Sequence, residues 1–317
     1  MKRHQQILAA VLVLQIILSI VTFWPRTASG EGGKPAIPDL QVKDIAALTI
    51  TNDQHTTISL RKVEDEWGLT DADQYPAKSA EIEALLEQLT QLDTGNLVAS
   101  TDTSHRQLQV AGDSYLRRVD LELTDGTKYT IYFGSAPRYT ATHFRVAGQV
   151  ETYLTTVVST WELNPTPSSW VNTTYTELDQ TTLTEVTLAN ANGTFTFVKE
   201  GEDWTLVGLA EGETLAAGKI SDIVSKSSRV TMLRPLGKTE KPEYGMNAPL
   251  ATVTLKSADA VYTVQVGAKN TTDNTYTVKS SESEYYVAVA EYSVKSLVEN
   301  TREDFLQAPE ETPTSTP

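Results

Sequence analysis

The chain has 317 residues, of which 41 are aspartate or glutamate and 26 are lysine or arginine, so its formal net charge is −15 at pH 7. A surface this acidic repels phosphate backbones, which argues against nucleic acid as a partner. The chain contains no cysteine, which excludes disulfides, thiolate metal sites and cysteine nucleophiles.

An apolar stretch lies close to the N-terminus. Lys2 and Arg3 precede the stretch Ile7–Trp24, which carries no charged side chain. A helix of this length at about 1.5 Å per residue spans roughly 27 Å, close to the hydrocarbon thickness of a bilayer. Residues 1–25 are therefore predicted to form an N-terminal transmembrane helix that anchors the protein. The positive charges before it predict a cytoplasmic N-terminus and a body outside the cytoplasm, at the cell membrane. Cleavage after Gly30 is the alternative.

The body contains a strand pattern that occurs twice. Apolar and polar residues alternate from Leu48 to Leu69 and again from Val186 to Leu206. The two runs end in the same way, in Trp67-Gly68-Leu69 and in Trp204-Thr205-Leu206. Such alternation predicts half-buried strands, and Asn192-Gly193 predicts a tight hairpin turn in the second copy.

Each copy then places one amphipathic helix. Residues 79–92 carry Ile82, Leu85, Leu86 and Leu89 on one face, and residues 217–230 are the weaker counterpart. Further strands are expected over residues 119–134 and 144–154, and over 253–267 and 276–287. Short closing helices are expected over 157–163 and 291–299.

These patterns predict an α+β fold of two tandem repeats, each an antiparallel sheet with one main helix, after the transmembrane helix. The repeats are expected to occupy residues 40–164 and 165–306. Residues 26–39 predict a flexible spacer, and the polar, Pro-rich residues 307–317 predict a disordered tail.

A set of short motifs gives the chain a family resemblance. The motifs are Trp204 to Leu206, then Tyr244-Gly245-Met246-Asn247-Ala248-Pro249, and the strand end from Thr263 to Gly267. With them the chain resembles the DUF4340 family of bacterial membrane-anchored proteins over roughly residues 40–306. The first copy departs from the pattern, with Leu108-Gln109-Val110 where the Tyr-Gly motif stands in the second. The resemblance implies no established activity; it implies an accessory protein that accompanies ABC-type export systems, including the gliding-motility type.

The residues that most often carry chemistry are scattered. His55, His105 and His143 show no spacing typical of a metal site, and solvated surface histidines are expected. Asp71 and Asp73 are interpreted as loop acids rather than a calcium pair. The chain also lacks a Gly-x-Ser-x-Gly elbow and a phosphate-binding Gly-rich loop. The sequence therefore predicts no catalytic, cofactor-binding or metal-binding residue, and no cofactor.

Three hypotheses of function follow. The first is a non-enzymatic scaffold or accessory component of a membrane complex, which the family resemblance implies to be an ABC-type export system. The second is a module that binds cell-envelope glycan, with Trp67 and Trp204 as stacking platforms if they are exposed rather than in the core. The third is an envelope hydrolase, which would need two carboxyl groups about 5–9 Å apart in a cleft.

Overall fold

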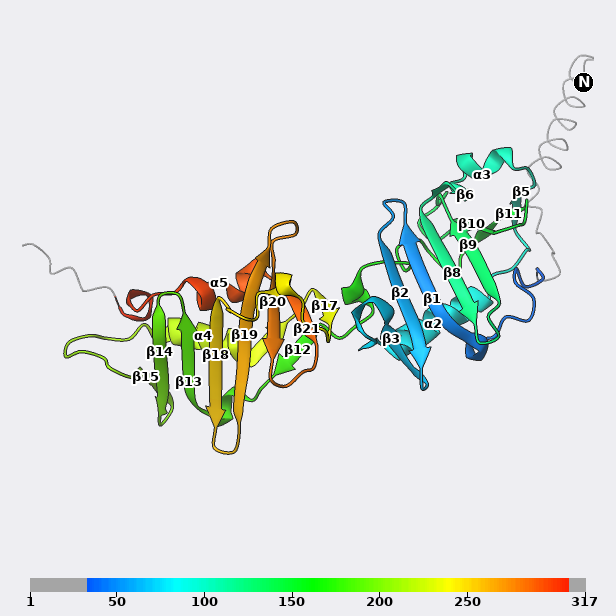
Figure 1. Ribbon diagram of the computed structural model, residues 1–317. Coiled ribbons are helices and arrows are strands. Elements are labelled where there is room, and N and C mark those ends of the chain that lie inside the picture. The colour runs from blue at the N-terminus through cyan, green and yellow to red at the C-terminus, as the bar shows by residue number, and fades with distance from the viewer. Residues whose placement is uncertain (1–32, 308–317) are drawn as a thin grey trace, which may run out of the picture.

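The computed structural model describes residues 33–307 (Figure 1). The segment predicted to be a transmembrane helix, residues 1–25, lies outside the described residues, as do part of the predicted spacer and most of the predicted tail. Within residues 33–307, no helix is long and apolar enough to cross a membrane.

The first part of the chain builds a nine-stranded antiparallel sheet, called the first sheet. Its strand order is β4-β3-β2-β1-β8-β9-β10-β11-β5. Helix α2 (Ser79–Thr90) packs on one face, and the short helix α3 (Thr103–Gln107) lies against the hairpin of β6 and β7. The strands are β1 (Ile45–Asn52), β2 (Thr57–Val63), β3 (Glu66–Leu69), β4 (Tyr75–Pro76), β5 (Leu97–Ala99), β8 (Arg117–Leu123), β9 (Lys128–Phe133), β10 (Thr142–Val146) and β11 (Thr152–Thr155), with a separate hairpin of β6 (Val110–Ala111) and β7 (Ser114–Tyr115).

The second part builds an eight-stranded antiparallel sheet, called the second sheet, with the order β15-β14-β13-β18-β19-β20-β21-β17. The two sheets have the same topology when the first is followed from β3 to β5 and the second from β15 to β17. Helices α4 (Ala217–Ser228) and α5 (Glu291–Glu299) accompany the second sheet. The strands are β13 (Leu183–Asn190), β14 (Gly193–Glu200), β15 (Asp203–Leu206), β17 (Arg234–Gly237), β18 (Ala251–Ser257), β19 (Val261–Asn270), β20 (Thr275–Ser280) and β21 (Tyr286–Ala290), with a separate pair of β12 (Thr174–Glu177) and β16 (Arg229–Thr231).

Short 3₁₀ helices connect these elements. They are η1 (Val42–Asp44), η2 (Thr70–Ala72), η3 (Pro167–Ser169), η4 (Gln180–Thr182), η5 (Pro242–Tyr244) and η6 (Glu303–Phe305).

The predicted α+β class is wrong, because the described chain is mostly β. Two large antiparallel sheets form the structure, and each main helix has only 12 residues. The edge strands β4, β5 and β17 have two to four residues each, too short for a periodic pattern to reveal them. Residues 157–163 form turns instead of the predicted helix, and the side chain of Glu162 accepts hydrogen bonds from Ser159. The second predicted closing helix is confirmed as α5.

Each sheet buries one face and leaves the other open. In the first sheet the residues that face α2 are fully buried, as Leu48 and Ile50 of β1 and Val119 and Leu121 of β8 illustrate. Burying a side chain of this size contributes about 1.5–3 kcal/mol. In Figure 1, α2 and α4 lie behind their sheets, so the open faces of both sheets turn towards the same side of the molecule.

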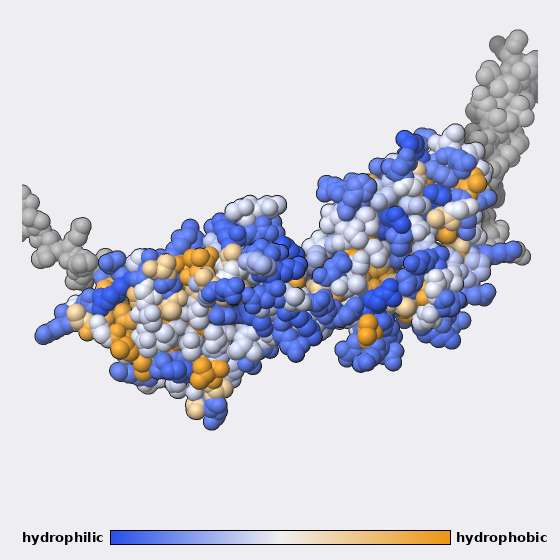
Figure 2. All heavy atoms as spheres, viewed as in Figure 1, coloured by the Kyte–Doolittle hydropathy of each residue, from blue (hydrophilic) through white to orange (hydrophobic). Residues whose placement is uncertain are grey.

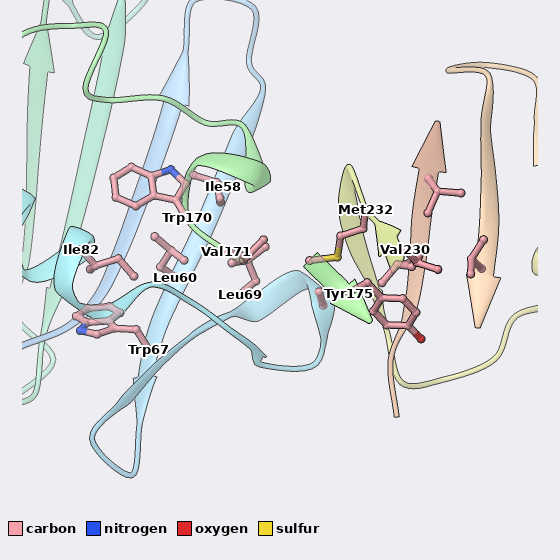
Figure 3. Packing of buried hydrophobic residues seen from close by; sticks show 14 of the residues in the cluster. Ile58, Leu60, Trp67, Leu69, Ile82, Trp170, Val171, Tyr175, Val230 and Met232 are labelled. Atoms are coloured by element: carbon pink, nitrogen blue, oxygen red, sulfur yellow. The ribbon is translucent and has the colours of Figure 1, made fainter. Parts of the chain in front are cut away.

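An apolar contact joins the two parts of the chain. The backbone amide of Lys78, before α2, donates to the carbonyl of Trp170 at 2.7 Å, and Ala77 forms a β-bridge with Val171. Trp170 and Val171 are buried, and Figure 3 shows Trp170 near Ile58 of the first sheet. Residues 170 and 171 therefore complete the first core from the start of the second part.

A polar contact reinforces this junction. The Asp73 carboxylate accepts from the backbone amide of Lys238 at 2.6 Å. The Tyr285 hydroxyl donates to the carbonyl of Gln74 at 3.2 Å. The rings of Tyr75 and Tyr285 meet edge to face, with their centroids 4.7 Å apart. Asp73, interpreted from sequence as a loop acid, thus connects the two sheets.

Candidate binding surface

The face of the first sheet that points away from α2 is called the first open face. It carries a hollow of about 430 Å³ that is lined mainly by polar residues. It forms because residues that alternate with the buried ones on β1, β2, β8 and β9 must point away from α2. Figure 2 shows hydrophilic and intermediate residues over most of this side of the molecule. The side chains that matter most for the hollow are Thr49, Ser59, Arg61, Arg118, Asp120, Glu122, Lys128 and Thr130.

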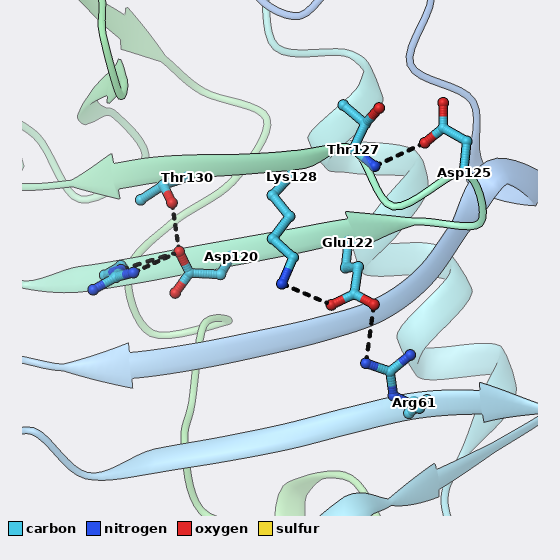
Figure 4. A network of polar contacts seen from close by, with 8 residues as sticks. Arg61, Asp120, Glu122, Asp125, Thr127, Lys128 and Thr130 are labelled. Atoms are coloured by element: carbon cyan, nitrogen blue, oxygen red, sulfur yellow. Dashed lines mark hydrogen bonds and ion pairs between the residues drawn. The ribbon is translucent and has the colours of Figure 1, made fainter.

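The charges on the first open face are paired across strands (Figure 4). Glu122 of β8 accepts from Arg61 of β2 at 3.2 Å and pairs with Lys128 of β9 at 3.3 Å. The hydrogen bond from Arg61, and then that from Lys128, hold the pKa of Glu122 below its ordinary value. Glu122 is therefore a fixed negative charge at neutral pH and is unsuited to act as a general acid.

A second pair lies within strand β8. Arg118 contacts the Asp120 carboxylate at 2.9 Å, and the hydroxyl of Thr130 donates to that same carboxylate. The hydrogen bond that Arg118 donates to Asp120 raises the pKa of Arg118. The first open face consequently presents positive and negative groups in a register set by the strands, which suits recognition of a complementary surface.

The second sheet has a corresponding open face with fewer charges. Lys256 of β18 pairs with Glu185 of β13 at 2.6 Å. The hydroxyls of Thr187 and Thr196 lie 3.2 Å apart on neighbouring strands. This face carries fewer charges than the first, because Thr254 stands opposite Thr187 where the first sheet places Asp120 opposite Thr49.

Two of the three histidines within residues 33–307 are buried, which corrects the expectation of solvated surface residues. His105 and His143 are each only 8% exposed, and His55 alone is exposed, in a turn. A ring nitrogen of His105 lies 2.7 Å from the carbonyl oxygen of Val150. Nδ1 of His143 lies 3.1 Å from the hydroxyl oxygen of Ser135. Each histidine thus has a local hydrogen-bond partner, and the fold does not bring the three together.

A serine and a lysine approach each other in a groove of about 680 Å³ between α4 and α5. Lys226 donates to the hydroxyl of Ser296 at 3.0 Å. Asp222 accepts from Ser296 at 2.7 Å and pairs with Lys226 at 3.0 Å. A lysine that activates a serine nucleophile must accept the hydroxyl proton, whereas here Lys226 donates to the hydroxyl. The arrangement is a satisfied hydrogen-bond network between two helices.

Carboxyl groups and metal ligands give the hydrolase hypothesis no support. A glycosidase acid needs a raised pKa. Within residues 33–307, every carboxyl whose pKa departs clearly from its ordinary value has it lowered, because hydrogen bonds and ion pairs outweigh burial. The same part of the chain contains no cluster of side chains able to hold a metal ion.

The Tyr244-Gly245 motif, which contributes to the family resemblance, contacts the strand end at Gly267 through its backbone. Gly245 has a φ of 68°, in the left-handed region, and directly follows Tyr244. A Cβ atom on Gly267, at the end of the matching strand segment, would collide with the carbonyl oxygen of Tyr244. The first sheet repeats this contact, because Gly134 lies against the carbonyl of Leu108 and the next residue, Gln109, has a φ of 58°.

The family whose description is "Domain of unknown function (DUF4340)" matches residues 67–249. The chain belongs to the DUF4340 family. The match begins at Trp67 in β3 and ends at Pro249, just before β18, so in this DUF4340 protein it crosses the junction between the two sheets. No curated protein and no solved structure matches the chain significantly.

Sequence reasoning did not single out the first open face. The alternation of Val119, Asp120, Leu121 and Glu122 indicated which side chains point outward. It could not indicate that Arg61 stands beside Glu122, because 61 residues separate them along the chain. That neighbourhood depends on β1 lying between β2 and β8.

Proposed function

We propose that this DUF4340 protein is a non-enzymatic accessory or scaffold component of a membrane complex and that the first open face is its docking surface. The observation that carries the proposal is the cross-strand network of Arg61, Glu122 and Lys128 around the hollow. Fixed charges of both signs give a partner a defined register and penalise a partner with like charges opposite them.

The location of the protein is part of this proposal. The uncharged sequence Ile7–Trp24 supports attachment to the cell membrane with the body outside the cytoplasm. Attachment raises the effective concentration of the body at the membrane, so a polar surface of modest intrinsic affinity is sufficient for binding. The family resemblance supports an ABC-type export complex, gliding-motility-like, as the class of partner.

The experiment is crosslinking and affinity purification of the full-length protein from its native membrane, followed by mass spectrometry. The decisive variant is Arg61→Glu, which reverses the charge beside Glu122 on the first open face. Lys256→Glu is the matched control, because Lys256 is similarly exposed and also pairs with a glutamate, but on the second sheet.

We expect the wild type and Lys256→Glu to recover the same membrane proteins and Arg61→Glu to recover about tenfold less. Thermal unfolding of both variants checks that each remains folded. Equal recovery by Arg61→Glu and the wild type would exclude the first open face as the docking surface. Recovery of the wild-type protein alone, under several mild detergents, would refute the scaffold function itself.

A further inference from the structure

A lysine and a tryptophan face each other at the same place in both sheets. Lys62 of β2 is opposite Trp67 of β3, and Lys199 of β14 is opposite Trp204 of β15. Both tryptophans point to the helix side of their sheet, in line with the buried Leu69 and Leu206. The two copies nevertheless differ in how the indole ring is covered.

In the first sheet the tryptophan is part of the core. Trp67 is only 2% exposed, and helix α2 packs against β3. From this helix Glu83 reaches Lys62, with 4.0 Å between its carboxylate and the ammonium group. Figure 3 shows Trp67 beside Ile82 of the same helix. No ligand can reach this ring while the fold is intact.

In the second sheet the equivalent ring is left partly open. Trp204 is only half-buried and lines a hollow of about 180 Å³ at the edge of the sheet. Ile220 and Ile223 of α4 occupy the places of Ile82 and Leu85, which puts Ser221 where α2 carries Glu83. The short Ser221 side chain does not reach across the hollow. The difference between the two copies therefore creates the opening beside Trp204.

Polar groups surround the indole ring in this hollow. They belong to Gln180, Thr181, Glu202 and Ser221. The ammonium group of Lys199 lies 6.0 Å from the ring centroid and donates to the carbonyl of Thr181 at 3.2 Å. An ammonium group has three N–H donors, so Lys199 can also donate to a ligand placed over the ring.

The indole ring offers a flat apolar surface, and the residues around the hollow offer hydrogen-bond donors and acceptors. This combination fits a sugar ring. A pyranose ring has an apolar C–H face and a periphery of hydroxyls, which need both donors and acceptors. Binding sites generally combine an aromatic surface with a few placed polar groups in this manner. A cationic ligand is disfavoured, because the ammonium group of Lys199 lines the same hollow. We propose that the hollow beside Trp204 binds one sugar ring of a polysaccharide.

This binding is independent of the docking surface proposed above. The hollow lies on the helix side of the second sheet, whereas the first open face lies on the opposite side of the first sheet. Trp204→Ala should therefore leave the recovery of membrane partners unchanged, and Arg61→Glu should leave sugar binding unchanged. The failure of one proposal can thus be told from the failure of the other.

The test is calorimetric titration of the full-length protein in detergent with two soluble probes, a cello-oligosaccharide and an oligomer of N-acetylglucosamine. We expect saturable binding of at least one probe, with a Kd of about 0.1–1 mM. Binding of only the acetylated probe would identify an amino-sugar polymer, and binding of only the other would identify a neutral glucan.

Three variants make the titration decisive. Trp204→Ala should weaken binding about tenfold or more. Ser221→Glu restores the residue type of the first helix, and we expect it to close the hollow and abolish binding without touching the core. Trp161→Ala is the matched control, because Trp161 is 64% exposed but lies elsewhere. No saturable binding of either probe at millimolar concentration would overturn the proposal, as would wild-type affinity in both Trp204→Ala and Ser221→Glu.

Discussion

At the scale of single residues, Glu213 and Arg302 form a forked ion pair beside η6. Each carboxylate oxygen of Glu213 lies 2.6 Å from a guanidinium nitrogen of Arg302, and one also accepts from the amide of Ala210. The hydrogen bond from Arg302, and then that from Ala210, lower the pKa of Glu213 from 4.5 to about 2. The folded protein therefore releases this proton more readily than the unfolded chain does. The resulting stabilisation is fully present above pH 4.5 and is lost as the pH falls to about 2.

The prediction is a difference between the pH dependence of the wild type and that of Glu213→Gln. Between pH 4.5 and about 2, the free energy of unfolding of the wild type should fall more steeply, because the variant has no proton to bind at this position. Urea unfolding at a series of pH values measures both curves. Parallel curves would mean that the pKa of Glu213 is the same in the folded and unfolded chain, so that the ion pair does not stabilise the fold above pH 4.5.

At the scale of elements, the contact between the Tyr-Gly motif and the matching strand end makes a sharp prediction. Gly267→Ala places a methyl group against the carbonyl of Tyr244, and a backbone atom cannot move away as a side chain can. Overpacking of this kind costs about 1–3 kcal/mol, and we expect the upper end of that range. Gly218→Ala is the control, because Gly218 lies in α4 with open space around it, and alanine there should stabilise by about 0.5–1 kcal/mol.

Urea unfolding of both variants measures this contrast. If the Gly267→Ala variant were as stable as the wild type, the motif would not be a structural contact, and its recurrence in the chain would need a functional reason.

The sequence predicted the main elements well and their surroundings poorly. Helix α2 lies where its apolar spacing placed it, although it ends at Thr90 rather than at residue 92. Helix α4 ends before residue 230 because Arg229–Thr231 pair with β12 as a strand. Periodicity reports which face of an element is buried, whereas strand pairing between distant segments leaves no local signal. The same reason explains why the fold class was wrong and why the burial of His105 and His143 was not foreseen.

The exposure of Trp204 is a property of a single side chain that the sequence could not predict. The duplication correctly placed Trp67 and Trp204 at equivalent positions. Whether the rings are exposed or in the core could not be read from the sequence: Trp67 is buried in the core, whereas Trp204 packs against it and is only half-buried. The degree to which α4 covers Trp204 depends on Ser221, a position that looks like an ordinary exposed helix residue in the sequence.

At the scale of the whole molecule, the junction determines whether the two sheets behave as one body. Trp170 and Val171 bury apolar surface between the sheets, and Tyr285 adds a ring contact with Tyr75 and a hydrogen bond to Gln74. A docking surface on one sheet and a ligand site on the other can act together only if the junction is rigid. Calorimetry of the wild type should therefore show one unfolding transition, with equal calorimetric and van't Hoff enthalpies.

Tyr285→Ala tests this coupling because it removes the ring contact and the hydrogen bond without entering either core. Each of these interactions contributes about 0.5–1.5 kcal/mol, so the coupling between the sheets should weaken by about 1–3 kcal/mol. We expect the single transition to broaden or split, with a van't Hoff enthalpy below the calorimetric one. Tyr139→Ala, at a tyrosine that is 86% exposed and outside the junction, should keep the wild-type transition. If Tyr285→Ala also kept it, the apolar contact of Trp170 and Val171 would by itself suffice to join the sheets, and the polar contact would serve only to orient them.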